Sequence, residues 1–480
     1  MLQGTGSDVG KSVLTAALCR IAHQRGLSVA PFKPQNMSNN AAACPGGGEI
    51  GRAQALQARA SGLAPETDFN PVLLKPQTDR EAQVVVHGQV RHHADAAEYM
   101  ATRGHLLKAV RESFDRLRER FELVIVEGAG SPAEINLRRG DIANMGFATS
   151  ADVPVILIGD IDKGGVIASL VGTQSVLDPE DARHIEGFII NKFRGDPQLF
   201  DAGVTAIEQR TGWPCFGVVP WQSAAAQLPA EDAVSIQPEA LRGDERLKIV
   251  APMLSRIANF DDADPLRQDP AVAFEWVPPG QPLPQSADVV ILFGSKSTLG
   301  DLDFLTAQGW NHDLISHARA GKRILGLCGG YQLLGEVIAD PEGVDGAPGR
   351  RAGLGLLAIE TTMVAAKTVR EIQGHCAHTS LPVGGYEIHV GRTTGTDCER
   401  PMLQLVDRLD GASSASGLIE GCYVHGLFAN DAYRAAWLQR AGARRASAWD
   451  YEGAVDAALD TLAASVESAL DVDALFALAR

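Results

Sequence analysis

The chain has 480 residues, a net charge of −16 and an apolar fraction of 45%. One hydrophobic core seldom organises a chain of this length, so we expect at least two domains. The acidic balance argues against nucleic-acid binding, which needs concentrated Lys and Arg. No apolar run reaches the roughly 20 residues of a membrane span, and the start lacks a signal-peptide pattern, so we expect a cytoplasmic protein. Seven cysteines without CxxC spacing indicate neither a disulfide framework nor a zinc site.

The first half of the chain alternates apolar segments with helical ones. A first helix is expected between Val13 and Gly26, where apolar residues recur at helical spacing. Strands are predicted at residues 27–32, 123–127, 153–160 and 187–191. Near-continuous apolar strands that alternate with helices are typical of a mostly parallel α/β sheet.

A glycine-rich segment, GTGSDVGKS at residues 4–12, lies between a very short first strand and the first helix. Gly6 and Gly10 allow backbone N–H groups to turn toward a phosphate at a helix N-terminus. Lys11 is expected to reach the outer phosphates of ATP, and Ser12 to hold Mg²⁺. The glycine positions make this a variant of the usual GxxxxGK(S/T) loop. Because a strand is normally about 5–6 residues long, the first strand is either clipped or begins upstream.

Other strand ends at the same sheet edge supply further groups expected of a nucleotide site. Glu127, in VIVEGAG, offers a carboxylate suited to Mg²⁺, and Lys33, in FKP, offers a second cation. Asp160 and Asp162, in GDIDKGG, fit a nucleotide site and a helix cap equally well.

The periodicity fades in the Ala-, Gln- and Pro-rich segment at residues 222–246. We place the domain boundary there, with an ATP-binding domain at 1–235 and a second domain at 246–440. A second α/β pattern follows, with strands predicted at 247–253, 288–293 and 323–327.

The last segment, residues 441–480, is Ala-rich and predicted to be helical. Val455, Leu459, Leu462 and Val466 lie on one stripe of this helix. Since an apolar stripe needs a core to cover it, we expect the segment to pack on the second domain.

The sharpest local signal is GLCGGYQ at residues 326–332, where an apolar strand runs into a Gly-flanked Cys and then a helix. This pattern is similar to a nucleophile elbow, which projects the side chain of Cys328. Backbone N–H groups at the helix start lower the thiol pKa and form an oxyanion hole. A Cys nucleophile needs a base, and His425, in YVHGLF, follows a short apolar strand downstream. His389, in YEIHVG, is a rival for this role.

With Cys328 and His425 in these contexts, the second domain resembles class I-type glutamine amidotransferases. The segment FGSKST at residues 293–298 is similar to the other oxyanion loop of that family, so the resemblance implies Gly294 and Gly329 as oxyanion donors. Most members carry a Glu two residues after the His, whereas this chain has Leu427. His425 must therefore be oriented by another group, or by none.

The first domain resembles dethiobiotin synthetases in GTGSDVGKS, FKP and VEGAG. Asn191, in IINKF, matches a position that contacts the nucleotide base in that superfamily. Such a domain joined to a Leu427-type amidotransferase is the architecture of the cobyrinic and cobyric acid amide synthases of cobalamin biosynthesis. PFKPQNMSNN, LKPQ, EGAGSPAEINL and GDIDKGG are similar to the cobyric acid synthase branch. The implied fold is a P-loop, dethiobiotin-synthetase-like parallel sheet domain followed by an amidotransferase α/β domain.

The resemblance implies a glutamine-hydrolysing ligase that uses ATP, L-glutamine and Mg²⁺. Its implied substrate is adenosylcobyrinic acid a,c-diamide, whose b, d, e and g carboxylates become amides through acyl phosphates to give adenosylcobyric acid. Candidates to offset the charge of this polycarboxylate are Lys33, Lys75, Arg138 and Arg139, although a solvated face explains the arginines equally well. Whether the chain forms a homo-oligomer stays open.

Three alternatives remain. The first is the sister enzyme that amidates the a and c carboxylates, against which the Asn-rich segment PQNMSNN argues. The second is a glutamine-dependent ligase for a cell-wall lipid intermediate, which usually carries its two activities on separate chains. The third is a ParA-like ATPase switch with an inert amidotransferase-like domain, against which intact Cys328 and His425 argue.

Overall fold

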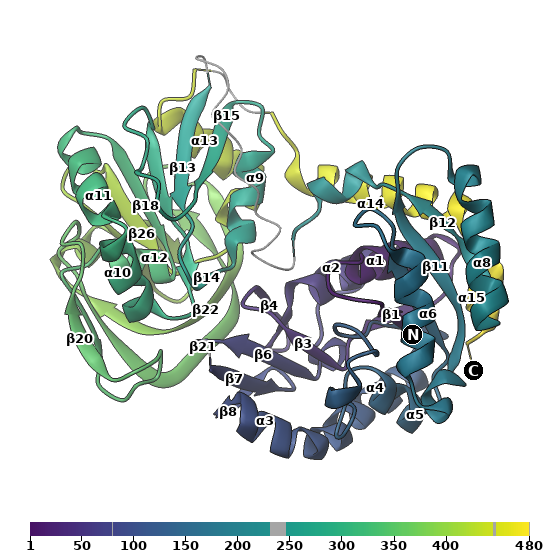
Figure 1. The fold of residues 1–480 in the computed structure, drawn as a ribbon. Coiled ribbons are helices and arrows are strands. Elements are labelled where there is room, and N and C mark those ends of the chain that lie inside the picture. Colours follow the sequence, from purple (N-terminus) through teal and green to yellow (C-terminus); the bar gives the residue numbers. More distant parts are fainter. Residues whose placement is uncertain (79, 231–245, 445–447, 480) are drawn as a thin grey trace.

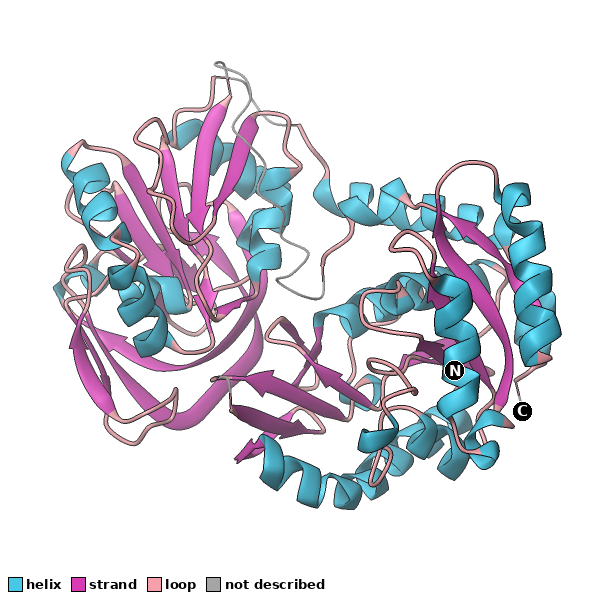
Figure 2. Ribbon diagram, in the orientation of Figure 1, coloured by secondary structure: helices cyan, strands magenta, loops and turns pink. Residues whose placement is uncertain are grey.

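Two α/β domains lie side by side in the computed structural model, which describes residues 1–78, 80–230, 246–444 and 448–479 (Figure 1). Figure 2 shows helices flanking the strands in both domains. The predicted boundary between residues 235 and 246 lies outside the described residues. Among the described helices, none combines the length and apolar character that crossing a bilayer requires.

The first domain is built on a parallel sheet, as the apolar strand pattern predicts. Its strand order is β2-β9-β1-β10-β11-β12, in which a parallel bridge between Leu2 and Glu127 joins β1 to the β9 edge. The strands are β1 (Leu2–Gly4), β2 (Val29–Phe32), β9 (Leu123–Val126), β10 (Val155–Asp160), β11 (Ile185–Phe193) and β12 (Cys215–Pro220). The helices of this domain are α1 (Lys11–Gln24), α2 (Arg52–Ala60), α3 (Ala96–Thr102), α4 (Leu107–Arg120), α5 (Met145–Ala151), α6 (Val166–Val176), α7 (Pro179–Ala182) and α8 (Asp201–Thr211).

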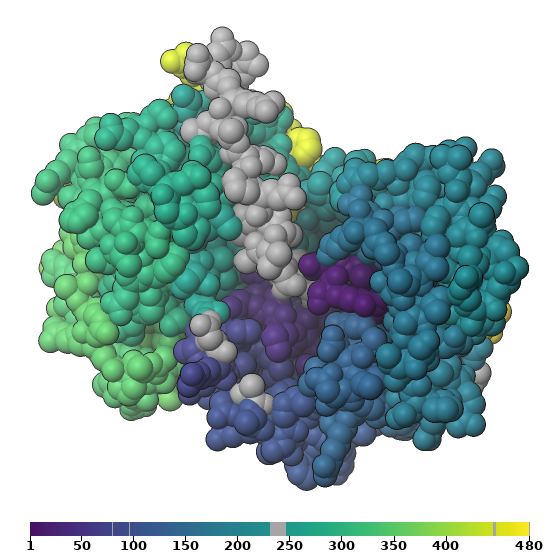
Figure 3. Space-filling view, in the orientation of Figure 1, coloured from purple at the N-terminus to yellow at the C-terminus, as the bar shows by residue number. Residues whose placement is uncertain are grey.

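A smaller sheet and a hairpin project from the first domain toward the second. The sheet has the order β3-β6-β7-β8, and the hairpin pairs β4 with β5. Their bounds are β3 (Gln35–Met37), β4 (Ala41–Ala43), β5 (Glu49–Gly51), β6 (Val72–Pro76), β7 (Glu81–Val86) and β8 (Gln89–Asp95). Apolar residues of both domains form one cluster here, which comprises Ala41, Ala43, Leu73, Val85, Tyr386 and Ile388. In Figure 3 the purple and dark blue N-terminal residues accordingly border the green second domain.

The second domain has a parallel sheet in the order β15-β13-β16-β18-β26, with β25 antiparallel at one edge. These strands are β13 (Leu247–Pro252), β15 (Val272–Val277), β16 (Val289–Leu292), β18 (Arg323–Leu327), β25 (Ala412–Ser413) and β26 (Ile419–Cys422). Another sheet comprises β19 (Val337–Asp340), β20 (Gly349–Ala352), β21 (Glu360–Cys376), β22 (Pro382–Thr394), β23 (Leu403–Leu405) and β24 (Leu409–Asp410). A short ladder pairs β14 (Ile257–Ala258) with β17 (Gly294–Ser295). The helices are α9 (Asp264–Arg267), α10 (Thr298–Ala307), α11 (Trp310–Arg319), α12 (Gly329–Leu333) and α13 (Asp431–Arg440).

The C-terminal segment corrects one expectation. Its helices α14 (Tyr451–Ala469) and α15 (Val472–Ala477) return to the first domain, where α14 packs on α1 and β12 (Figure 1). The predicted stripe of Val455, Leu459, Leu462 and Val466 is fully buried, but in one core with residues of α1 such as Leu14 and Ile21. The amphipathic pattern indicates that a face is buried without indicating which core it covers.

Candidate active sites

Cys328 lies at a strained turn between β18 and α12. Its backbone has φ 51° and ψ −110°, in the left-handed half of conformational space that non-glycine residues rarely adopt. A Cβ on Gly329 would come within 2.6 Å of the Ser295 nitrogen, and one on Gly330 within 1.9 Å of the Leu292 oxygen. The turn therefore requires glycine at both positions. Its strained backbone and close packing are those of the predicted nucleophile elbow.

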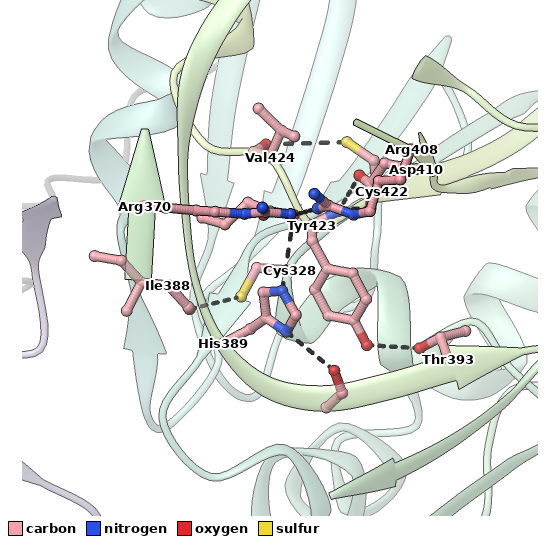
Figure 4. A network of polar contacts seen from close by, with 12 residues as sticks. Cys328, Arg370, Ile388, His389, Thr393, Arg408, Asp410, Cys422, Tyr423 and Val424 are labelled. Carbon is pink, nitrogen blue, oxygen red and sulfur yellow. Dashed lines mark hydrogen bonds and ion pairs between the residues drawn. The ribbon is translucent and has the colours of Figure 1, made fainter. Parts of the chain in front are cut away.

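The thiol of Cys328 is buried, and it donates to the carbonyl oxygen of Ile388 at 3.5 Å (Figure 4). A small pocket of about 40 Å³ adjoins it. His425 and Gly294 line this pocket together with Cys328. Since a Cβ on Gly294 would lie 3.4 Å from Cε1 of His425, the FGSKST loop passes directly beside the imidazole. The structure thus brings the predicted amidotransferase residues together.

Asp262 is the group that orients His425. Its Oδ2 lies 2.7 Å from Nδ1 of His425, and its Oδ1 accepts a 2.7 Å hydrogen bond from the Gly426 amide. Both side chains are almost fully buried. With Nδ1 donating to Asp262, Nε2 is the ring nitrogen left for Cys328. The imidazole therefore has a fixed tautomer and orientation without the Glu that Leu427 replaces.

The charges around His425 favour an imidazolium. Burial by itself lowers the pKa of His425, but the negative charges of the Asp262 carboxylate and of Cys328 in its ionised form raise it more, to about 10. A thiolate beside an imidazolium is the reactive form of a nucleophilic cysteine.

The sequence prediction missed Asp262, which lies 163 residues before His425. It belongs to a 3-10 helix, η7 (Phe260–Ala263), within the segment NFDDADPL. Three acidic residues between Phe260 and Leu266, all of them buried, are an unusual combination because buried carboxylates need partners. This cluster of acidic residues among apolar ones is the sequence feature that could have pointed to Asp262.

His389, the rival base, also lines the pocket but is engaged elsewhere. Its Nδ1 lies 3.0 Å from the Gly391 oxygen, and its Nε2 lies 3.7 Å from Oε1 of Glu387. Its ring stacks on Tyr423 with centroids 3.8 Å apart, as Figure 4 shows. Both ring nitrogens therefore face groups other than the Cys328 thiol.

The glycine-rich loop curls around the side chain of Lys11. Lys11 Nζ donates to the carbonyl oxygens of Gly6, at 3.0 Å, and Gly130, at 3.1 Å. Gly10 has φ 100°, and a Cβ there would lie 2.2 Å from Nδ2 of Asn191. Asn191 Nδ2 in turn donates to the Val9 oxygen at 2.8 Å, so Asn191 packs directly on this loop.

Glu127 is the centre of a buried polar network at the start of α1. Its Oε1 accepts from Ser12 Oγ at 2.7 Å and from Lys33 Nζ at 2.8 Å. Its Oε2 accepts from Gln57 Nε2 at 2.6 Å. The predicted residues Ser12, Lys33 and Glu127 therefore meet at one sheet edge, and Gln57 of α2 joins them without having been predicted.

The remaining candidates form ion pairs. Asp160 lies 2.9 Å from Lys192, and Asp162 lies 2.6 Å from Arg194. Lys75 pairs with Glu49 at 2.8 Å, and Arg138 pairs with Asp181 at 2.6 Å, whereas Arg139 is exposed. The described residues hold no cluster of three or more His, Cys, Asp or Glu arranged for a metal ion.

Comparison with known proteins matches each half of the chain to a domain family. Residues 1–236 match the CobQ/CobB/MinD/ParA nucleotide binding domain, and residues 248–433 match the CobB/CobQ-like glutamine amidotransferase domain. A cobyric acid synthase of Hyphomonas neptunium (strain ATCC 15444) is 64% identical over 479 residues, which cover 100% of this chain and 97% of that protein. The chain belongs to the cobyric acid synthase family. Cobyric acid synthases of Paracoccus denitrificans (strain Pd 1222) and Methylorubrum populi (strain ATCC BAA-705 / NCIMB 13946 / BJ001) are 61% and 56% identical, each covering 100% of this chain and 99% of the relative.

Membership of the cobyric acid synthase family confirms the predicted resemblance and the predicted fold class. The chain is an amidating ligase that joins a nucleotide-binding domain to a glutamine amidotransferase domain.

Proposed function

We propose that the chain uses ATP and glutamine to amidate the b, d, e and g carboxylates of adenosylcobyrinic acid a,c-diamide, giving adenosylcobyric acid. The name shared by relatives at 56–64% identity over the full length supports the product. The observation that carries the chemistry is the buried arrangement of Cys328, on its elbow turn, with His425 and Asp262. This arrangement favours a working glutaminase over an inert amidotransferase-like domain.

The glutaminase step begins with attack of the Cys328 thiolate on the carboxamide carbon of glutamine. Backbone N–H groups of Gly294 and Gly329 receive the developing oxyanion. His425 gives its proton to the departing nitrogen, so that ammonia leaves and a glutamyl thioester remains. His425 then accepts a proton from water, which cleaves the thioester to glutamate and restores the thiolate. Asp262 orients the His425 ring throughout and stabilises the imidazolium whenever the ring is protonated.

The synthetase step takes place at the glycine-rich loop. Gly6, Gly10 and Lys11 bind the ATP phosphates, and Asn191 contacts the nucleotide base. A corrinoid carboxylate attacks the γ-phosphorus, which releases ADP and leaves an acyl phosphate. Ammonia then attacks the acyl carbon and displaces phosphate, giving the amide. Positioning and charge neutralisation carry most of the phosphoryl transfer.

Ser12 and Glu127 fit the Mg²⁺ that accompanies ATP. Their hydroxyl and carboxylate oxygens lie 2.7 Å apart beside the loop, and Mg²⁺ prefers oxygen donors together with phosphate oxygens and water. When bound, the ion neutralises charge on the phosphates. Lys33, 2.8 Å from Glu127, adds a second positive charge beside the transferred phosphoryl group.

The test is mass spectrometry of adenosylcobyrinic acid a,c-diamide after incubation with ATP and either glutamine or ammonium. We expect wild type to give four successive acid-to-amide changes with either nitrogen source. Cys328→Ala should lose the glutamine-driven reaction and keep the ammonium-driven one. Glutamine hydrolysis without any change of the corrinoid would reject the substrate and keep the two-domain chemistry. Wild type that hydrolyses no glutamine would favour the ATPase switch instead.

A further inference from the structure

The loop that orients His425 is held in place by the nucleotide-binding domain. Arg52, the first residue of α2, lies 2.8 Å from Oδ2 of Asp261, the neighbour of Asp262. Its guanidinium also lies 6.0 Å from the centroid of the Tyr386 ring. Tyr386 stacks on the His425 imidazole, with centroids 5.2 Å apart. One side chain of the first domain therefore pairs with the neighbour of Asp262 and lies over the ring that stacks on His425.

The charges explain why a cation is needed at this position. Asp261 and Asp262 are consecutive, and each is about 4% exposed. Burial and the charge of Asp262 raise the pKa of Asp261, whereas Arg52 opposes this rise. Because Asp262 must remain ionised to stabilise the imidazolium of His425, Arg52 is the counter-charge that lets both carboxylates remain in the loop.

A second set of contacts fixes the same loop from the same domain. The backbone amide of Asn259 donates to Oδ1 of Asn40 at 2.7 Å, and its side-chain Nδ2 donates to the Ala41 oxygen at 2.7 Å. The same Nδ2 donates to the hydroxyl of Tyr386, in the second domain, at 2.9 Å. Asn40 is the last residue of the motif PQNMSNN, and Ala41 begins β4. The geometry around His425 thus depends on docking of the first domain.

The other end of α2 reaches the ATP site. Gln57 Nε2 donates to Oε2 of Glu127 at 2.6 Å and to the backbone carbonyl oxygen of Ser12 at 3.4 Å. Gln54 Oε1 accepts from Asn36 at 2.8 Å. An α-helix rises about 1.5 Å per residue, so Arg52 and Gln57 lie only roughly 8 Å apart along the axis. A single nine-residue helix therefore contacts Glu127 at one candidate site and the neighbour of Asp262 at the other.

We propose that Arg52 is a positioning residue for glutamine hydrolysis and that α2 couples this hydrolysis to the ATP site. The inference rests on the proposed roles of His425 and Glu127. Binding of ATP and Mg²⁺ at Ser12 and Glu127 changes the partners of Gln57, and the resulting adjustment of α2 sets the position of the Asp261–Asp262 loop. Coupling of this kind needs a binding free energy that differs between two arrangements of the helix. Ammonia is then released mainly when the synthetase site is loaded.

The test compares Arg52→Gln with Arg59→Gln in the full-length enzyme. Arg59 lies on the same helix, but it pairs with Glu452 and Asp456 of α14, away from the second domain. We expect Arg52→Gln to lower the kcat of glutamine hydrolysis about 10- to 100-fold, as small misplacements of a catalytic group do. Ammonium-driven amidation should persist in both variants, and Arg59→Gln should hydrolyse glutamine normally. Equal hydrolysis by the two variants would overturn the proposal, as would parallel loss of both reactions in Arg52→Gln.

A second comparison tests two things separately: whether Arg52 acts by balancing the charge of Asp261, and whether α2 couples glutamine hydrolysis to the ATP site. Arg52→Gln/Asp261→Asn removes both charges of the Arg52–Asp261 ion pair, so hydrolysis without ATP should recover toward wild type. ATP with Mg²⁺ should stimulate hydrolysis in wild type and no longer do so in the double variant. Retention of that stimulation in the double variant, or its absence from wild type, would overturn the coupling. Cys328→Ala tests the proposed function on which the inference rests. Glutamine hydrolysis that survives this substitution would reject Cys328 as the nucleophile, whatever the Arg52 variants do.

Discussion

The carboxylate of Asp262 gives His425 an acidic partner that its own strand does not supply. Where an acid follows the base closely in sequence, one strand end orders both groups. Here the acid comes from η7, and it is held by the Gly426 amide as well as by the imidazole. The orientation of the base therefore depends on how the η7 loop is packed, which ties the glutaminase to the domain interface.

We expect Asp262→Asn to lower glutaminase kcat/KM by about 10²-fold or more, because general acid–base catalysis contributes a factor of that size. The pKa of His425 is raised above its ordinary value mainly by the charge of Asp262. Removing that charge lowers the pKa, so the imidazolium is lost at a lower pH. The alkaline limb of the kcat/KM profile should accordingly move to lower pH in the variant. An unshifted limb would show that Asp262 does not control the charge of the base.

The sequence predicts Cys328 and His425 because each lies in a local motif whose neighbours are also informative. Gly329 and Gly330 are needed by the turn itself, so the elbow can be recognised without any tertiary contact. Asp262 cannot be found in this way, since its role depends on a contact across 163 residues of chain. Gln57 is missed for the same reason, because nothing around it in the sequence indicates a partner at Glu127.

At the scale of elements, strand positions follow from apolar runs. The prediction for residues 323–327 coincides with β18, and the other predicted strands differ from the observed ones by one or two residues at their ends. Helix α14 shows the limit of this approach. A stripe of apolar residues has the same pattern whichever core it covers, and α13 packs in the core of the second domain whereas α14 packs in that of the first.

A matched pair of substitutions tests the placement of α14. Leu459→Ala on α14 should destabilise the first domain by about 2–5 kcal/mol, the usual cost of removing a fully buried leucine side chain. Leu438→Ala on α13 should have the same effect on the second domain, whose core contains Leu438. Hydrogen exchange resolved by peptide should show faster exchange in α1 for the first variant and in β18 for the second. Faster exchange in β18 on substitution of Leu459 would contradict the observed packing.

At the scale of the whole molecule, the two domains share a buried ion cluster beside the glutaminase pocket. Glu49 of β5 pairs with Lys75 of β6 at 2.8 Å and also with Lys367 of β21, across the domain interface. Lys367 further donates to Oε1 of Gln83 at 3.2 Å. Lys75 and Lys367 also line the pocket that adjoins Cys328. Docking of the domains therefore completes the wall of this pocket with a lysine from each side.

Glu49→Gln should loosen this wall. Burial opposes ionisation of Glu49, but Lys367 and Lys75 lower its pKa to about 2, so the carboxylate is charged throughout the neutral range. Removing one partner of a buried ion cluster typically costs about 3–5 kcal/mol, because the remaining charges are left uncompensated. This loss of stability weakens the docking of the two domains, because Lys367 of the second domain pairs with Glu49 of the first.

Ammonia formed at Cys328 should then escape to solvent more often before it meets the acyl phosphate. We expect Glu49→Gln to release more glutamate per amide formed than wild type, whereas its ammonium-driven amidation stays near the wild-type rate. Glu66→Gln is the control, because Glu66 pairs with Arg120 within the first domain, away from Lys75 and Lys367. The ratio of glutamate to amide is read from one reaction, so it is insensitive to the fraction of active enzyme. A ratio equal to that of wild type and of Glu66→Gln would show that this cluster does not contain the ammonia.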